Sequence, residues 1–175
     1  MDKSEFRKAA LSKRRLILNK DKKSESIQLK LIELCKAYNH IGVYINKEDE
    51  VSTRMFIETM MIQGKHIYVP KTIDSIMNFH EFSTFDELKV GKYGILESEG
   101  RIHNQLECLV VPLVAFDNKK NRLGMGKGCY DRFIEKHEEC YLIGIAFEEQ
   151  YYNEVIVDKY DKCLDIIVTE SKIYW

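Results

Sequence analysis

The sequence has few of the features that mark membrane, secreted or nucleic-acid-binding proteins. None of its apolar runs approaches the ~20 residues that a membrane span requires. The formal net charge is −1, so no excess of basic residues indicates a nucleic acid or a membrane surface as partner. The first residues are charged and lack the apolar core of a secretory signal. These absences predict a soluble, cytoplasmic protein.

Cysteine and proline are also uninformative as markers of special chemistry. The five cysteines are odd in number, and no two have the spacing of a metal-binding knuckle or a redox pair. They predict reduced thiols, which are typical of the cytoplasm. The only two prolines, Pro70 and Pro112, each end an apolar run. The length of 175 residues predicts one domain, residues 1–175, with a single core.

Helical and strand patterns alternate along the chain. In residues 24–38, Ile27, Leu31, Leu34 and Cys35 recur at helical spacing. The predicted helices cover residues 4–18, 24–38, 52–63, a short turn from 84, and 131–137. The predicted strands cover residues 41–45, 66–69, 77–82, 108–112, 141–147 and 165–169. This alternation, with several strands apolar on both faces, predicts a layered α/β fold with a largely parallel central sheet flanked by helices.

The most informative stretch is glycine-rich, residues 124–132 (GMGKGCYDR). Glycines let the backbone approach an anion closely, and the start of the predicted helix adds partial positive charge. Lys127 supplies a mobile cation and Asp131 a possible metal ligand. The spacing matches neither the usual nucleotide loop nor the dinucleotide-binding pattern. The stretch therefore predicts an anion site, with phosphate as its ligand. A ligand-free turn is the alternative.

Two loops are expected to meet at one edge of the sheet. Ligands of parallel sheets bind outside the carboxyl ends of the strands. The glycine-rich stretch follows the strand that ends at Pro112, and the loop after Ile45 carries Glu48, Asp49 and Glu50. The sequence therefore predicts one shared cleft.

Three basic residues form a stripe on the first predicted helix. Lys3, Arg7 and Arg14 fall within about 40° of one another on a helical wheel. The stripe is either a solvated helix face or a clamp for an anionic group, because arginine pairs with phosphate oxygens in a bidentate manner.

Candidate metal ligands and nucleophiles are few. Asp131, Asp161 and Asp165 could bind Mg²⁺, which needs only one or two carboxylates beside substrate phosphates. Asp131 alternatively only stabilises the start of its helix. None of the five histidines has the spacing of a metal site or a nucleophile pair. Cys129, beside the glycines, is either a packing residue or a reactive thiol at a helix start.

Two adjoining blocks resemble the signature of the 5-formyltetrahydrofolate cyclo-ligase family. They are residues 110–117 (VVPLVAFD) and 121–132 (NRLGMGKGCYDR). The likeness extends over nearly the whole chain, through Lys3 and Arg7 and residues 50–53, 91–97, 146–150, 161–165 and 168–170. The resemblance implies an architecture similar to the NagB/RpiA/CoA-transferase-like fold.

The resemblance also implies an activity. Members of this family convert 5-formyltetrahydrofolate to 5,10-methenyltetrahydrofolate with ATP and Mg²⁺. They release ADP and phosphate, through a phosphorylated formyl intermediate. We accordingly expect a ligase of one-carbon metabolism that acts as a monomer, with 5-formyltetrahydrofolate as its small-molecule substrate.

The resemblance implies roles for individual residues. Catalysis would involve Arg122, Lys127 and Tyr130, and Asp131 and Asp161 would bind the metal. The implied ATP-binding residues are Lys3, Arg7, Arg122, Leu123, Gly124, Met125, Gly126, Lys127, Gly128, Cys129 and Tyr130. The implied folate-binding residues are Ile45, Glu50, Tyr93, Met125, Gly126, Lys127, Gly128 and Cys129.

Three other functions compete with the cyclo-ligase interpretation. A folate-binding protein without catalysis could sequester 5-formyltetrahydrofolate. Such a protein would not need metal-binding carboxylates such as Asp131 and Asp161, or the cation Lys127. A sugar-phosphate or acyl-CoA enzyme on a related α/β scaffold would act without ATP. An interaction module would show exposed apolar or charge-block patterns, which the sequence lacks. Leu113 and Cys129 depart from the family's usual glycine and tyrosine without removing a phosphate or metal group.

Overall fold

Seven strands form the central sheet, in the order β11-β10-β9-β6-β1-β2-β3. We describe it in a computed structural model that covers residues 1–175. The five inner strands run parallel, and the strands at the two edges are antiparallel to their neighbours. The strands are β1 (His40–Val43), β2 (His66–Ile73), β3 (Ile76–Glu81), β6 (Cys108–Val111), β9 (Tyr141–Ile145), β10 (Ile166–Val168) and β11 (Ile173–Tyr174). The predicted α/β class and the largely parallel sheet are confirmed.

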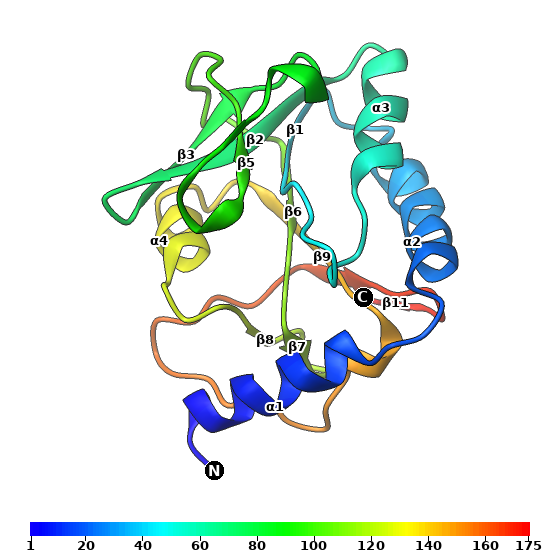
Figure 1. Ribbon diagram of the computed structural model, residues 1–175, viewed down its shortest axis with the longest axis vertical. Helices are drawn as coiled ribbons and strands as arrows, with labels where there is room; N and C mark the ends of the chain where they lie inside the picture. The colour runs from blue at the N-terminus through cyan, green and yellow to red at the C-terminus, as the bar shows by residue number, and fades with distance from the viewer.

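Helices cover both faces of this sheet (Figure 1). Helices α2 (Lys20–Cys35) and α3 (Arg54–Ile62) pack on one face around a core of 23 buried residues, and α4 (Cys129–Lys136) packs on the other face. Helix α1 (Lys3–Arg15) instead crosses below the carboxyl ends of the strands. No helix combines the length and the apolar character that a membrane crossing demands.

Two short antiparallel pairs lie outside the main sheet. They are β4 (Lys89–Val90) with β5 (Leu96–Glu97), and β7 (Ala115–Phe116) with β8 (Arg122–Leu123). The β7–β8 pair separates β6 from the glycine-rich stretch, which the sequence had suggested would follow β6 directly. Its apolar residues pack with Phe6 and Ala10 of α1, so this hairpin is the platform on which α1 rests.

Several predicted boundaries were wrong by a few residues. Helix α1 ends at Arg15, and α2 begins at Lys20 rather than at residue 24. The four residues 16–19 separate them, and the last of these, Asn19, is left-handed (φ 59°). Lysine is a good helix former, and Asp21 in the first turn is stabilised by the helix dipole, so the polar stretch after Asn19 forms the start of the helix. Thr53, not Ser52, precedes α3, and its hydroxyl donates to the Tyr44 carbonyl oxygen at 2.8 Å.

Strand β2 continues through Pro70, where the sequence had predicted its end. Its pairing with β1 stops at Tyr68, so Pro70 lies where β2 pairs only with β3, opposite Phe79. A proline is tolerated at such a position because its missing N–H is not needed for a second neighbour. The hairpin then turns at Asp74 and Ser75, both at positive φ.

Candidate active site

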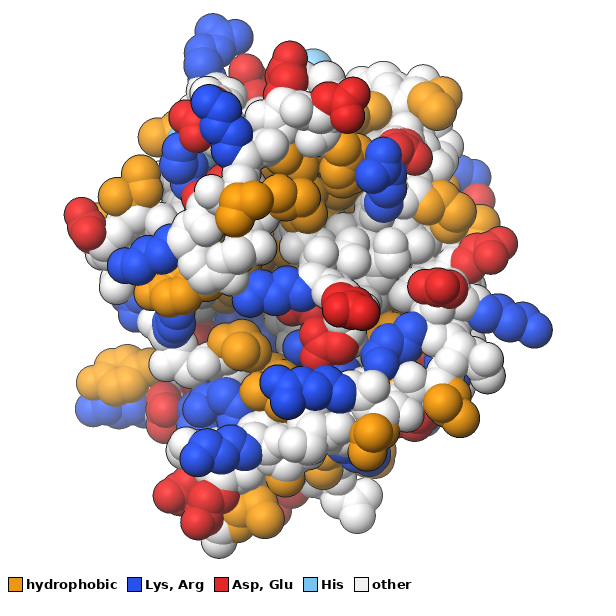
Figure 2. All heavy atoms as spheres, in the orientation of Figure 1, with side chains coloured by type: hydrophobic (Ala, Val, Ile, Leu, Met, Phe, Trp, Pro, Cys, Tyr) orange, Lys and Arg blue, Asp and Glu red, His pale blue; other side chains and the backbone are white.

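A cavity of about 890 Å³ opens at the carboxyl ends of β1 and β6. Its wall combines α1, the loop after β1, the segment around the 3₁₀ turn η2 (Lys92–Gly94), the glycine-rich stretch with the start of α4, and residues 158–161. Figure 2 shows lysine and arginine side chains gathered along the hollow between α1 and the strands above it. The predicted shared cleft is confirmed.

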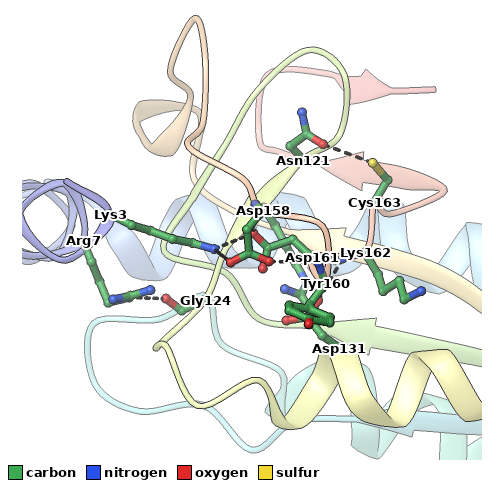
Figure 3. Close-up of polar contacts among 11 residues, drawn as sticks. Lys3, Arg7, Asn121, Gly124, Asp131, Asp158, Tyr160, Asp161, Lys162 and Cys163 are labelled. Atoms are coloured by element: carbon green, nitrogen blue, oxygen red, sulfur yellow. Dashed lines mark hydrogen bonds and ion pairs between the residues drawn. The ribbon is translucent and has the colours of Figure 1, made fainter. Parts of the chain in front are cut away.

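The basic stripe of α1 faces this cavity rather than solvent. Lys3, Arg7 and Arg14 all line the wall, and Arg14 is only 4% exposed. The Arg7 Nε donates to the carbonyl oxygen of Gly124 at 2.7 Å, which ties α1 to the glycine-rich stretch (Figure 3). The alternative of a solvated helix face is therefore wrong for these three residues.

The glycine-rich stretch offers unused backbone donors beside Arg7. No N–H group of Met125, Gly126, Lys127 or Gly128 donates a hydrogen bond within the protein. Gly126 and Gly128 adopt φ angles of 95° and 67°, a region that side chains with a Cβ rarely occupy. Unpaired N–H groups at the start of a helix, next to a guanidinium, suit an anion such as phosphate.

Replacing Gly126 with alanine should damage this anion site selectively. A Cβ there would lie 3.0 Å from the Arg7 Cζ, in addition to the strain at positive φ. We expect the affinity for a phosphate-bearing ligand to fall about 10-fold, because Arg7 must move. Gly64→Ala is the matched control, since Gly64 has a φ of 80° with no atom within 4 Å of the added Cβ. Equal affinities for this ligand in the two variants would contradict the role of the glycine.

Arg122 is the most buried cation of the site together with Arg14. Its side chain is 3% exposed, and its Nη2 donates to Asp131 Oδ1 at 3.0 Å. Its Nε is buried and has no hydrogen-bond partner in the protein. Buried polar atoms are nearly always paired, so this donor marks a place where a ligand acceptor fits.

Lys127 lies against an aromatic ring and makes no ion pair. Its Nζ is 2.8 Å from the centre of the Tyr93 ring, and the lysine lowers the pKa of the Tyr93 hydroxyl. Tyr93 has a φ of 65°, so the η2 turn holds this ring over the glycine-rich stretch in a strained conformation. The ammonium group is thus positioned at the cavity without a carboxylate that would neutralise it.

Two carboxylates of the site, Asp131 and Asp161, lie on adjoining segments (Figure 3). Oδ1 of Asp131 accepts from Arg122 and from the Lys162 N–H at 3.0 Å, and Oδ2 of Asp161 accepts from Lys3 and from the Asp158 N–H at 2.8 Å. The second oxygen of each carboxylate accepts no hydrogen bond from the protein.

This donor set suits one kind of metal. No group of three or more histidine, cysteine and acidic side chains is arranged to hold a metal ion, which argues against a closed structural site. Two carboxylates with free oxygens, next to an anion site, fit Mg²⁺, whose remaining ligands are water and phosphate. Asp165 is not part of this set, because its carboxylate accepts from the Leu142 N–H at 2.7 Å just before β10, at the other end of the strands.

The loop after β1 contributes another part of the wall, which carries Glu50. Its Oε2 accepts from the Lys47 N–H at 2.7 Å, and burial raises the pKa of this carboxyl group. Burial and the charge of Glu50 also raise the pKa of Tyr130, so that hydroxyl stays a neutral donor. Ile45 and Tyr44 complete the wall. A carboxylate next to the apolar side chain of Ile45 suits a flat ligand with paired N–H donors.

All but one of the residues that the family resemblance implied for the site line the cavity. The exception is Leu123, which is fully buried in the apolar cluster beneath α1. Cys129 lies at the wall, half-buried, and its Sγ is 3.7 Å from an Arg132 nitrogen. Sequence reasoning did not select Asp158, which lines the cavity and pairs with Lys3 at 3.1 Å, although its place three residues before Asp161 was a usable signal.

The model of the 5-formyltetrahydrofolate cyclo-ligase family matches residues 1–170 of this chain. The chain belongs to this family. Among curated cyclo-ligases, it is 34% identical over 176 residues to the probable enzyme of Schizosaccharomyces pombe, with 87% of this chain and 86% of that protein covered. It is 32% identical over 151 residues to the Haemophilus influenzae enzyme, covering 80% of each chain.

Solved structures of the cyclo-ligase family have the same fold. The 5,10-methenyltetrahydrofolate synthetase of Aquifex aeolicus superposes with a TM-score of 0.87 at 29% identity, covering 99% of this chain and 92% of that one. The synthetase of Mycoplasma pneumoniae gives 0.80 at 28% identity, covering 97% and 99%. The expectation of an enzyme of the cyclo-ligase family is confirmed.

Proposed function

We propose that residues 1–175, acting as one domain, convert 5-formyltetrahydrofolate to 5,10-methenyltetrahydrofolate with ATP and Mg²⁺, releasing ADP and phosphate. The observation that carries the proposal is the single cavity that joins an anion site to a carboxylate-bearing apolar wall. Membership of the cyclo-ligase family supports it.

The chemistry asks the protein mainly to position groups and to neutralise charge. The oxygen of an N-formyl group is a poor leaving group, and phosphorylating it yields an imidate-like phosphate that N10 of the folate can attack. Ring closure then expels phosphate. Lys127 and Arg122 would stabilise the negative charge of the transferring phosphoryl group. Lys3 and Arg7 would bind the nucleotide phosphates together with the N–H groups of residues 125–128.

The remaining residues would hold the folate and the metal. Glu50 would accept hydrogen bonds from the amino edge of the pterin, between Ile45 and Tyr130. Asp131 and Asp161 would bind Mg²⁺, which supplies charge neutralisation on the phosphate oxygens when bound. Tyr93 would cover the bound ligands from the η2 turn.

The decisive experiment follows the near-UV absorbance of purified protein with 5-formyltetrahydrofolate, ATP and magnesium. We expect an increase characteristic of the methenyl product that disappears when ATP or magnesium is withheld. No increase, with folate binding still measured by calorimetry, would instead favour a protein that sequesters 5-formyltetrahydrofolate. Absence of both activity and binding would refute the proposal.

Asp161→Asn should weaken the dependence on metal selectively. The variant keeps the shape of the side chain but loses one carboxylate of the proposed metal site. We expect the magnesium concentration for half-maximal velocity to rise at least ~10-fold, with the KM for folate unchanged. Asp21→Asn, on the exposed face of α2, is the matched control. An unchanged magnesium requirement would exclude Asp161 as a ligand.

A further inference from the structure

Arg14 of the basic stripe forms an ion pair with Asp49, which its position on the helix did not predict. Its Nε and Nη2 both lie 3.1 Å from Oδ2 of Asp49, and its Nη1 donates to the carbonyl oxygen of Leu113 at 3.3 Å. With 4% exposure, the guanidinium is inside the wall of the cavity. Unlike Arg7, whose Nε donates to a backbone carbonyl oxygen, Arg14 is therefore already paired with a protein carboxylate.

Asp49 belongs to the tight turn that presents Glu50. The Lys47 N–H donates to Glu50 Oε2 at 2.7 Å, and the Glu50 N–H donates back to the Lys47 carbonyl oxygen at 3.2 Å. Just before the turn, Asn46 Oδ1 accepts from the Thr53 N–H at 3.2 Å. The contact from Arg14 is the ion pair that connects this turn, through the neighbouring residue Asp49, to another element of the fold.

We propose that Arg14 is a positioning residue for folate, which acts by fixing the 47–50 turn through Asp49 so that the Glu50 carboxylate faces the pterin. Because Lys3 and Arg7 lie on the same helix, Arg14 also connects the folate-binding turn to the nucleotide-binding side of the cavity. The inference rests on the proposed function and adds to it a residue that need not touch either substrate.

Positioning is distinguishable from a purely electrostatic effect on Glu50. The charged and titratable groups near Glu50 are Arg14 of α1, Lys47 and Asp49 of its own turn, Tyr44 after β1 and Tyr130 of α4. Arg14 lowers the pKa of Glu50, whereas Asp49 raises it. Asparagine at position 49 should therefore have two opposite effects. Loss of the Asp49 charge should favour the ionised form of Glu50, whereas loss of the ion pair with Arg14 should weaken folate binding.

The test compares Asp49→Asn and Arg14→Lys with the wild type at pH 8, well above the usual pKa range of a glutamate. Calorimetry with 5-formyltetrahydrofolate should give a Kd on the order of 10-fold higher for each variant, because the carboxylate is misplaced. The KM for ATP should stay within about twofold. Asp49→Asn should also shift the acidic decline of folate binding to lower pH. Arg14→Lys keeps the positive charge, so it separates the geometry of the guanidinium from its charge.

Glu149→Gln is the matched control, because it removes the ion pair with Lys23, which lies outside the cavity. Its folate Kd should equal that of the wild type. A wild-type Kd in both Asp49→Asn and Arg14→Lys would overturn the positioning role while leaving the cyclo-ligase proposal intact. A wild-type protein that neither binds nor turns over folate would instead refute the proposed function itself.

Discussion

Lys127→Ala is expected to reduce kcat by at least ~100-fold, the scale of losing one contact to charge that develops in a transition state. The ammonium group lies at the cavity without an anionic partner, against the Tyr93 ring, so it is available to a phosphoryl group. Folate binding should remain largely intact, because Glu50, the proposed pterin contact, lies on a different segment, the loop after β1. The measurement is steady-state turnover by product absorbance, with folate affinity measured in parallel.

Lys119→Ala is the matched control for this prediction. Lys119 is an exposed lysine in the turn between β7 and β8, outside the cavity wall. Its removal changes the net charge by the same amount and should leave kcat unchanged. Turnover at the wild-type level in Lys127→Ala would remove this residue from the mechanism.

Glu50→Gln should raise the KM for folate by roughly 10- to 100-fold, because a neutral amide replaces charge-assisted hydrogen bonds to the pterin. The KM for ATP should change little. The neighbouring exposed acid provides the control Glu48→Gln, which should behave as wild type. An unchanged folate KM in Glu50→Gln would exclude the proposed contact between this carboxylate and the pterin.

The same residue predicts a pH dependence with a definite sign. Burial raises the pKa of Glu50 above the usual value for a glutamate. The ionised form accepts the hydrogen bonds, so kcat/KM for folate should fall as the pH drops through this raised pKa. Glu50→Gln should lack that acidic decline. A decline of the same position and size in the variant would assign it to another group.

The sequence predicted which residues form the site better than it predicted the hairpin and the ion pair that hold them in place. The glycine spacing of residues 124–128 and the wheel positions of Lys3 and Arg7 are local patterns, and both lie where expected. The β7–β8 hairpin escaped prediction because two-residue strands show no periodicity. The pairing of Arg14 with Asp49 could not be foreseen either, since 35 residues separate them and only the folded sheet brings them together.

Misplaced expectations have similar causes. The resemblance implied Leu123 as an ATP-binding residue, but alternation along β8 turns its side chain into the core while Arg122 faces the cavity. Asp165 lies near Asp161 in sequence, yet the chain between them runs from one end of the sheet to the other before β10 begins. For both residues, the path of the backbone decides whether the side chain reaches the cavity, and this path depends on tertiary packing.

Helix α1 also restricts how this protein can diverge. Lys3, Arg7 and Arg14 reach one cavity only because whole helical turns separate them. Inserting or deleting a single residue between Arg7 and Arg14 would rotate one of them by about 100° away from the wall. Exposed positions of the helix such as Lys8 and Ser12 are free of this restriction. We therefore expect relatives of this chain to exchange residues on the outer face of α1 while its length between the two arginines stays fixed.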